Sequence, residues 1–321
     1  MRQGWKRLLC GLATALIWTG AAAEQAVNQP GSAGRVVEPT IEEALSIEPR
    51  AEFYIEEEGK DYAVGYKDPT LEIHITEGRW EDTGWMAARI KIAYPAQLRT
   101  YMAGGRYGKA QTEYVRVYAK RNNAVLAIND DWFMNRGNVG SVVRQGVSYR
   151  ALCRGNSDIL GIDDQGDFHL FQKATNEDIA NFEGKLVNTF TFGPGIVIDG
   201  VAQEVTVNND MGAFHKAQRM GIGQIGPLEY ICVCCEGPED PGSKGLTIQQ
   251  FGELVASFGD VRLFYNLDGG SSSTMAFKGK TRRGEETFFA KINARNNPKE
   301  RVAGGCIYFI SAWQTEEETE E

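Results

Sequence analysis

The chain has 321 residues, of which 42% are hydrophobic and 24% are charged, a composition typical of a soluble globular protein. This length is enough to bury a substantial core in one large domain or in two modest ones. The formal net charge of −9 argues against nucleic-acid binding, which normally shows a basic surface.

The first 23 residues have the pattern of a secretory signal. A basic start with Arg2, Lys6 and Arg7 precedes an apolar stretch that is short for a membrane-spanning helix, and three alanines follow as a small-residue cleavage site. We therefore expect residues 1–23 to be a signal peptide and the protein to be secreted or to act in the cell envelope. An uncleaved segment would instead anchor the chain to a membrane.

Residues 24–61 are polar, with proline and glycine early and acidic residues late, which predicts a linker or a loosely attached segment. From Tyr62 onward the apolar residues become regular in their spacing. The patterns predict strands at 71–76, 86–94 and 124–128, a helix near 109–123, and a hairpin at 195–207 around an Asp-Gly pair.

The clearest unit lies near the C-terminus. Strand-like residues 228–237 precede an amphipathic helix at 247–259, which Thr247 and Gln250 begin as a capping box, and a strand at 261–268 follows. This order predicts a crossover between parallel strands. We expect one α+β domain over 62–310, with a mixed β-sheet flanked by helices, and a disordered acidic tail over 311–321.

Five cysteines remain after the predicted signal: Cys153, Cys232, Cys234, Cys235 and Cys306. No Cys-x-x-Cys pair is present, so the spacing does not predict a zinc site. In a strand, Cys232 and Cys234 share one face while Cys235 points to the other, which favours packing in the core. A disulfide that involves Cys153 or Cys306 stays open for an oxidising compartment.

Three predicted strands or glycine-rich stretches carry polar residues at one end, where connecting loops present functional groups. "AVLAINDDWF" places Asn129, Asp130 and Asp131 after a strand, and "FHKAQRMGIGQIG" places His215 and Arg219 before one. "NLDGGSSSTMAF" begins with Asn266 and contains the third set. Because ligands of open α/β sheets bind at the carboxyl ends of strands, Asp131 and Asp268 are expected to converge.

The loop after Asn266 has a composition that suits an anion. Two glycines let the backbone approach a ligand and turn its N–H groups inward, and four hydroxyl side chains add donors. These residues are Gly269, Gly270, Ser271, Ser272, Ser273 and Thr274. No lysine follows as in a P-loop, so an ordinary structural turn is the alternative.

The carboxylates near this loop have three alternative roles. Asp131 and Asp268 could work as a general acid/base pair. Alternatively, these two and Asp130 could ligate a hard cation through oxygen. In the third reading, Asn129 and Asp130 only cap a turn. Arg219 is suited to fork-like recognition of a phosphate, with a surface ion pair as its alternative.

Five blocks in order resemble the bacterial phosphodiester glycosidase family: "LAINDDWF", "FTFGPGIVIDG", "RMGIGQIG" with "LTIQQFGELVASFG", "YNLDGGSSSTMAFKGK", and "ERVAGGCIYF". The resemblance covers roughly residues 62–310. It implies hydrolysis of an N-acetylhexosamine, or a related sugar, joined through its anomeric carbon to a phosphodiester in a glycan or cell-envelope polymer. The loop and Arg219 would stabilise the phosphate, Asp131 and Asp268 would stabilise the sugar cation, and Gly193 would shape the pocket wall.

Two positions depart from the family pattern. Ser271 stands where the family usually has a third glycine, and a positive φ there would cost serine roughly 1 kcal/mol or more. Asp130 stands where the family usually has a glycine after the asparagine. These departures leave open a glycan-binding protein that does not cleave. The acidic cluster, as a set of metal ligands, leaves open a metal-dependent phosphodiesterase that cuts the P–O bond. The leading interpretation is a hydrolase that requires no cofactor, although a divalent cation at the acidic cluster stays open.

Overall fold

The computed structural model describes residues 34–43, 45, 47–108, 111–134, 139–206, 212–280, 286–287 and 300–315. The predicted signal peptide and residues 316–321 of the predicted tail lie outside the described residues. All described residues belong to one unit of contacts that starts at Ala33. Within them, no helix combines the length and the apolar composition needed to cross a bilayer.

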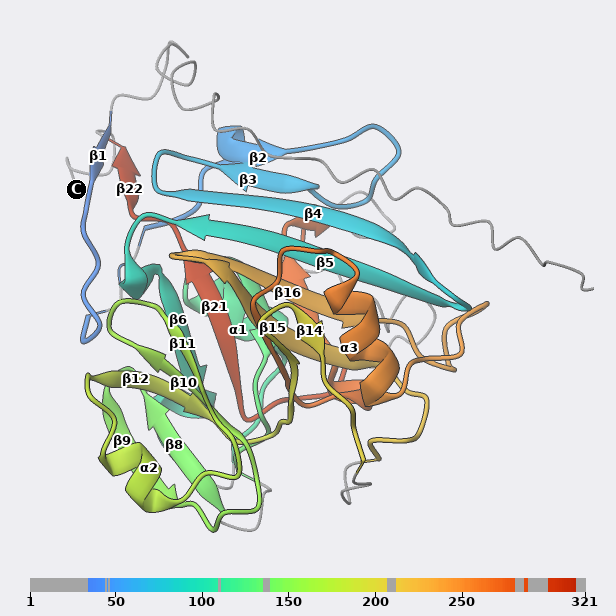
Figure 1. The fold of residues 1–321 in the computed structure, drawn as a ribbon. Coiled ribbons are helices and arrows are strands. Elements are labelled where there is room, and N and C mark those ends of the chain that lie inside the picture. The colour runs from blue at the N-terminus through green and yellow to red at the C-terminus, as the bar shows by residue number, and fades with distance from the viewer. Residues whose placement is uncertain are drawn as a thin grey trace, which may run out of the picture. The chain divides into compact units, whose positions relative to one another are not determined.

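Two β-sheets dominate the described part of the chain (Figure 1). The larger has nine strands in the order β14 (Val201–Ala202), β13 (Gly195–Ile198), β17 (Leu263–Asn266), β15 (Arg219–Gly226), β16 (Glu229–Cys235), β5 (Thr83–Ile92), β4 (Leu71–Trp80), β3 (Gly65–Lys67) and β2 (Tyr54–Ile55). The smaller has the order β18 (Met275–Phe277), β7 (Ala124–Asn129), β21 (Gly305–Ile310) and β6 (Leu98–Met102).

Smaller elements complete the described chain. A three-stranded sheet has the order β11 (Phe168–Phe171), β10 (Ile159–Asp163) and β12 (Leu186–Phe190). Three further sheets have two strands each. They pair β8 (Gly140–Arg144) with β9 (Val147–Leu152), β1 (Gly34–Val36) with β22 (Trp313–Thr315), and β19 (Gly279–Lys280) with β20 (Glu286–Thr287). The α-helices are α1 (Val115–Arg121), α2 (Asn176–Ala180) and α3 (Ile248–Ala256), and the 3-10 helices are Ala51–Phe53, Pro95–Gln97, Ala103–Gly105 and Gly270–Ser272.

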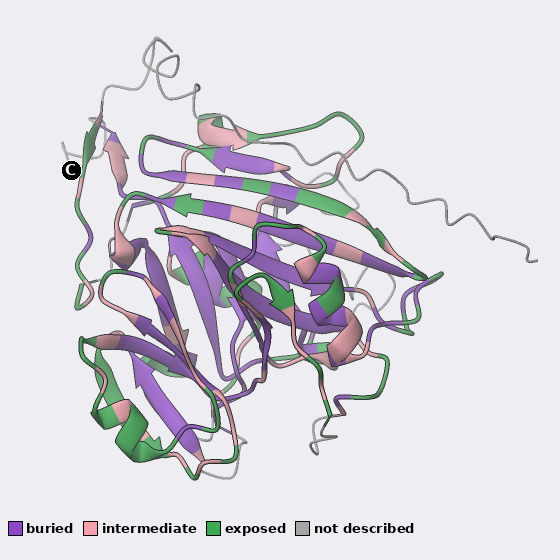
Figure 2. Ribbon diagram, viewed as in Figure 1, coloured by how far each residue is buried: buried purple, intermediate pink, exposed green. Residues whose placement is uncertain are grey.

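The two main sheets pack face to face, and one helix covers the outer face of each. The largest apolar cluster joins Ile73, Ile90 and Cys232 of the nine-stranded sheet to Ile128 and Ile307 of the four-stranded sheet. A second cluster joins the other face of the larger sheet to α3, and a third joins the other face of the smaller sheet to α1. Figure 2 shows the buried residues concentrated along these central strands.

The sequence patterns predicted the strands well because burial alternates along them. Leu71, Ile73 and Ile75 of β4 are buried while His74 is exposed on the other side, as expected for a half-buried strand. All residues of β7 are buried, which explains its continuous apolar run. The Asp199–Gly200 turn between β13 and β14 has φ values of 50° and 79°, the positive values that a two-residue hairpin needs.

The expected mixed sheet is wrong. Every strand pairing recorded among the described residues is antiparallel. β16, α3 and β17 follow one another as predicted, and Thr247 forms the expected capping box with Gln250. However, β15 lies between β16 and β17 and pairs antiparallel with both, so these two strands are parallel without being neighbours. The described chain is therefore mainly antiparallel β-structure with few helices.

The polar N-terminal segment makes more contacts than a linker would. β1 pairs with β22, β2 pairs with β3, and Arg99 donates through Nη1 to the carbonyl oxygen of Thr40 at 2.7 Å. β22 also places residues 313–315, predicted as tail, in a strand. The N-terminal segment is thus attached to the nine-stranded sheet through β2, and residues 313–315 pair with that segment through β1, which composition alone does not reveal.

Candidate active site

Asn129 joins the end of β7 to the glycine-serine loop that follows β17. Its Nδ2 donates to the carbonyl oxygen of Asp268 at 2.8 Å, and its Oδ1 accepts from the N–H of Thr274 at 2.9 Å. The N–H of Asp268 also donates to the carbonyl oxygen of Asp130 at 3.3 Å. Because β18 continues from the loop and pairs with β7, the first and third polar stretches meet at one place.

The backbone of the loop does not form the expected anion cradle. The N–H of Gly270 donates to the carbonyl oxygen of Gln218 at 2.9 Å, and the N–H groups of Ser272 and Ser273 donate to carbonyls within the loop. These N–H groups are therefore used by the fold and not by a ligand. The buried hydroxyls Ser273 Oγ and Thr274 Oγ1, in contrast, have no hydrogen-bond partner among the described residues. Both hydroxyls are covered by protein atoms, whereas Ser271 of the same loop is exposed.

Gly270 and Ser271 differ in what their backbones require. Gly270 has a φ of +58°, in the left-handed region that favours glycine. Ser271 does not have a positive φ, and it is exposed to solvent. The strain expected from serine at this position is therefore absent, and the departure from the family pattern leaves the loop conformation undisturbed.

Asp268 has the environment of a titrating group. Burial raises the pKa of its carboxyl to about 6. Hydrogen bonds from the Ser272 side chain and the Gly269 backbone, together with the positive charge of Arg301, oppose this rise and favour the ionised form. Both protonation states of Asp268 are therefore accessible near neutral pH, as acid/base or electrostatic catalysis requires.

Asp131 is held by a buried ion pair. Its Oδ1 lies 2.7 Å from Nη2 of Arg144, and its Oδ2 accepts the N–H of Thr191 at 2.6 Å. Both side chains are at most 3% exposed. The guanidinium of Arg144 also lies over the rings of Phe133 and Phe190, at 5.1 and 4.5 Å from their centroids. Since both carboxylate oxygens are engaged, the geometry does not support the expected acid/base partnership of Asp131 with Asp268.

Asp130 is buried with one oxygen unpaired. Its Oδ1 accepts the N–H of Trp132 at 3.2 Å, whereas its Oδ2 has no hydrogen-bond partner among the described residues and lies 4.0 Å from Arg144 Nη2. A Cβ on Gly305 would stand 2.5 Å from this Oδ2, so the carboxyl fills the space that this glycine leaves. Burial, and then the charge of Asp131, raise the pKa of Asp130 to about 7.

Arg219 organises a loop instead of projecting into solvent. Its Nε donates to the carbonyl oxygen of Leu246 at 2.9 Å, and its Nη2 donates to the carbonyl oxygens of Gly212 at 3.0 Å and of His215 at 2.5 Å. Burial lowers the pKa of Arg219. Its side chain passes beside Gly269, where a Cβ would stand 3.8 Å from its Cδ. The positive charge of Arg219 thus lies next to the glycine-serine loop, although Nε and Nη2 of its guanidinium already donate to carbonyl oxygens.

His215 is exposed, whereas Gly193 is buried. The His215 side chain belongs to an exposed residue, and its backbone contributes the carbonyl that Arg219 binds. Gly193 precedes a cis peptide bond to Pro194 and exchanges hydrogen bonds with Asn266, whose Nδ2 donates to its carbonyl oxygen at 2.9 Å. Gly193 therefore lies beside the end of β17, close in the fold to the start of the loop.

Four residues of the site were not predicted from the sequence: Trp132, Arg144, Arg301 and Gly305. Arg301 acts on Asp268 and stacks over Trp132, with its guanidinium carbon 5.7 Å from the ring centroid. Arg144 and Gly305 surround the carboxylates of Asp130 and Asp131 as described above. The blocks "NDDWF" and "ERVAGGCIYF" contain three of the four, but only a known contact between the blocks would have revealed their roles.

The described residues contain no group of three or more His, Cys, Asp or Glu side chains that could hold a metal ion. Cys153, Cys232, Cys234, Cys235 and Cys306 all carry free thiols. Cys232 and Cys234 pack in the cluster between the sheets, and Cys235 packs in the cluster under α3. The predicted alternation is confirmed, and the disulfide that was left open for Cys153 or Cys306 is not formed.

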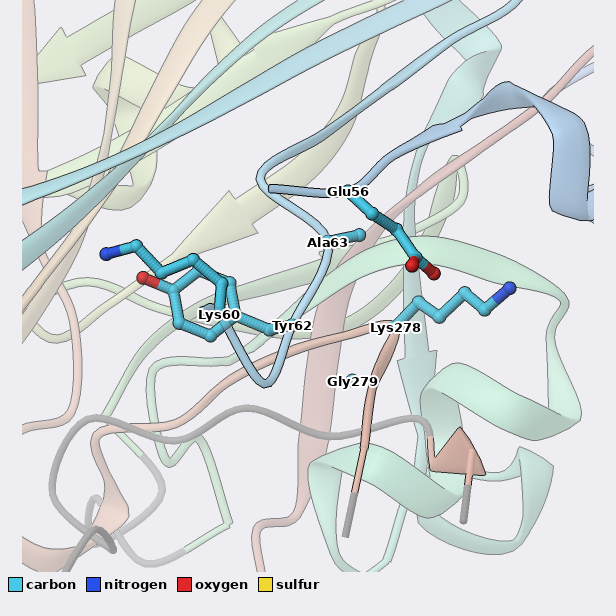
Figure 3. A pocket seen from close by; sticks show the side chains of 6 residues that line it. All are labelled: Glu56, Lys60, Tyr62, Ala63, Lys278 and Gly279. Atoms are coloured by element: carbon cyan, nitrogen blue, oxygen red, sulfur yellow. The ribbon is translucent and has the colours of Figure 1, made fainter. Parts of the chain in front are cut away.

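A pocket lies beyond the opposite end of β18 from Thr274. Figure 3 shows Lys60 and Tyr62 on one side of it and Glu56 and Lys278 on the other, and Ala63 and Gly279 complete its lining. None of the predicted site residues lines it. We therefore place the candidate active site at the junction of β7 and the glycine-serine loop and not in this pocket.

One family model and several solved structures are similar to this chain. A family model described as phosphodiester glycosidase matches residues 122–309, which include all the site residues named above. A zebrafish structure, the N-acetylglucosamine-1-phosphodiester alpha-N-acetylglucosaminidase catalytic domain auto-inhibited by its pro-peptide, has a TM-score of 0.59 and 17% identity. The match covers 84% of this chain and 88% of that one.

A second similar structure is a hypothetical protein from Synechocystis, with a TM-score of 0.54 and 13% identity. The match covers 75% of this chain and 62% of that one. No curated protein matches the sequence. At these identities the structural comparisons establish the fold alone.

Proposed function

Because the chain belongs to the phosphodiester glycosidase family, we propose that it hydrolyses the anomeric bond of a sugar-1-phosphodiester. The observation that carries this proposal is the environment of Asp268. This carboxyl is partly buried, has a pKa raised to about 6, and feels both a hydrogen bond from the Ser272 side chain and the positive charge of Arg301. A carboxylate and a cation side by side suit a reaction that develops opposite charges on the sugar and the phosphate.

The reaction adds water across the bond between the anomeric carbon and the phosphate oxygen. The carbon–oxygen bond breaks, its electron pair leaves with the phosphate, and the water oxygen forms the new bond to carbon. A free sugar and a phosphomonoester result. Asp268 as a carboxylate stabilises the positive charge that develops on the sugar ring. The phosphomonoester leaves as a weakly basic dianion, so little protonation of the leaving oxygen is needed, and the proton that the attacking water loses passes to the solvent or to this product.

Other residues hold this centre in place. Arg301 and Ser271, which are exposed, receive the phosphate, and Arg219 adds positive charge beside Gly269. Asp131 positions the chain after β7 through its ion pair with Arg144. Asn129 locks Asp268 to β7.

The predicted signal and the family support a proposal for the substrate and the compartment. The printed name of the zebrafish structure refers to an N-acetylglucosamine phosphodiester, which favours an N-acetylhexosamine here. We propose that the protein acts outside the cytoplasm, on a carbohydrate phosphodiester of a glycan or cell-envelope polymer, and that turnover requires no metal ion. Treatment with a chelator followed by an activity assay tests the last point.

Hydrolysis of a chromogenic N-acetylglucosamine phosphodiester tests the function directly. We expect the wild type to release the sugar and the Asp268→Asn variant to lose turnover by a factor of about 10²–10⁴. Asp260→Asn is the matched control, because Asp260 pairs with Arg89 on the exposed surface. Binding of the substrate by the wild type without product would contradict the proposal and favour a non-catalytic glycan-binding protein. Oxygen-18 from water in the phosphate instead of the sugar would show cleavage of the P–O bond.

A further inference from the structure

Three aromatic rings form a stack at one side of the β8–β9 hairpin, and we call them the aromatic stack: Phe133, Tyr107 and Tyr149. The ring of Tyr107 lies between the other two, with centroids 5.8 Å from Phe133 and 5.3 Å from Tyr149 and interplanar angles of 22° and 18°. Phe133 is fully buried, whereas Tyr149 is 38% exposed. The stack therefore runs from the interior to the surface.

Arg150 fixes the stack and carries an unpaired charge. Its Nη1 donates to the carbonyl oxygen of Phe133 at 2.9 Å and to the hydroxyl of Tyr107 at 3.5 Å. Its Nε and Nη2 are buried and have no hydrogen-bond partner among the described residues.

An unpaired guanidinium is an expensive feature to keep. A buried donor without a partner costs about 1–3 kcal/mol, and more when the group is charged. Nε and Nη2 of Arg150 are unpaired among the described residues, although the whole chain is acidic with a net charge of −9. A cation left without a counter-ion on an aromatic surface is complementary to an anionic ligand that has an apolar face.

The stack is continuous with the candidate active site. The ring of Phe133 lies 5.1 Å from the guanidinium of Arg144, which binds Asp131 at 2.7 Å. The preceding residue, Asp130, accepts the N–H of Asp268 through its carbonyl oxygen. The connecting residues are buried, so the contacts place the inner end of the stack beside the residues that support Asp268, and only its outer end at Tyr149 is open to a ligand.

We propose that the aromatic stack and Arg150 form a second subsite, which binds the neighbouring unit of a polymeric sugar-phosphate substrate. The apolar face of a sugar ring packs on the exposed ring of Tyr149, and the adjoining phosphate pairs with Arg150. Because Nε and Nη2 are covered by protein atoms, this pairing includes a side-chain movement at the exposed end of the stack. The inference rests on the proposed function and adds that the substrate is a chain of sugar phosphates.

Two substrates separate the subsite from the reaction centre. One is the small chromogenic N-acetylglucosamine phosphodiester, and the other is an oligomer of N-acetylglucosamine 1-phosphate. We expect Tyr149→Ala and Arg150→Gln each to lower kcat/KM for the oligomer at least tenfold more than for the small substrate. Tyr114→Ala is the matched control, since Tyr114 is an exposed tyrosine 5.0 Å from the guanidinium of Arg116 at the start of α1. It should change neither value.

Equal losses for both substrates, or no loss for the oligomer, would overturn the subsite. Calorimetric titration with the oligomer, in the Asp268→Asn background with and without Tyr149→Ala, measures binding without turnover. A tenfold weaker affinity with Tyr149→Ala supports the subsite, and equal affinities reject it. If the wild type cleaves neither substrate, the proposed function fails while this titration still decides the subsite. Thermal unfolding of each variant identifies a loss that arises from the fold.

Discussion

Asp131 and Arg144 form an ion pair of 2.7 Å in which both side chains are almost fully buried. A buried pair of this kind positions the chain around it, because either charge alone would be costly to keep away from water. Arg144 also stacks against two phenylalanine rings, so the pair joins β8 to the polar end of β7. The residue that the sequence offered as a catalytic partner is thus better placed to support Asp268 than to react.

Removal of Asp131 should destabilise the protein strongly. Asp131→Asn removes the carboxylate 2.7 Å from Arg144 and leaves only the Asp130 carboxyl, 4.0 Å away, beside this buried guanidinium. We expect a loss of up to about 3–5 kcal/mol in the free energy of unfolding, measured in urea. Asp260→Asn is the control, because Asp260 also lies 2.7 Å from an arginine, Arg89, but on the surface. Its loss should be about 0–1 kcal/mol. Similar losses in the two variants would contradict the supporting role of Asp131.

Asp130 should make stability depend on pH. Its pKa is about 7 in the folded protein, whereas an unfolded aspartate has a pKa of about 3.9. The stability that its protonated form contributes is full below about pH 4 and is lost as the pH rises to about 7. Asp130→Asn does not titrate, so the variant should gain stability relative to the wild type across this window. Urea unfolding at intervals between pH 4 and pH 8 measures the difference, and a difference independent of pH would refute the prediction.

Arg301 should set the pH at which the enzyme becomes active. Ionisation of Asp268, with a pKa of about 6, predicts that kcat/KM rises as the pH increases through about 6. Arg301 lowers this pKa by its charge, so Arg301→Gln should move the rise to higher pH. Arg301→Lys keeps the charge and should move it less. A pH profile that is the same in all three proteins would exclude Arg301 from the control of Asp268.

Adjacent substitutions in the glycine-serine loop should have unequal effects. Gly270→Ala places a Cβ at a φ of +58°, which costs about 1–2 kcal/mol of stability even though nothing lies within 4 Å to collide with it. Ser271→Gly restores the glycine usual in the family and should change stability by less than that, because Ser271 does not have a positive φ. Thermal unfolding compares the two variants. A larger loss from Ser271→Gly would mean that its hydroxyl has a structural role.

Local patterns predicted local structure because they record burial directly. The alternation in β4, the continuous run in β7 and the capping box at Thr247 are each decided by residues within one element. Sheet order is decided by partners far along the chain, so the pattern around α3 did not reveal that β15 separates β16 from β17.

The sequence could predict which residues form the site, but not which hydrogen-bond partner each of them has. Asp268 and its loop could be located from the sequence because a polar run follows a buried strand. Hydrogen bonds from Gly270 to Gln218 and from Arg219 to three carbonyls depend on tertiary contacts. From composition alone, these backbone and guanidinium donors would be expected to bind a ligand. In the structure they bind carbonyl groups of the protein instead.

The position of β21 has a consequence for how the protein is made. This strand comes near the end of the chain, yet it lies between β7 and β6 and pairs with both. During synthesis β6 and β7 emerge some two hundred residues earlier and have no partner on their facing edges until β21 is translated. Exposed strand edges favour aggregation. We expect that truncation before Gly305 gives a chain that depends on chaperones and is degraded, even though it retains Asp268 and its loop.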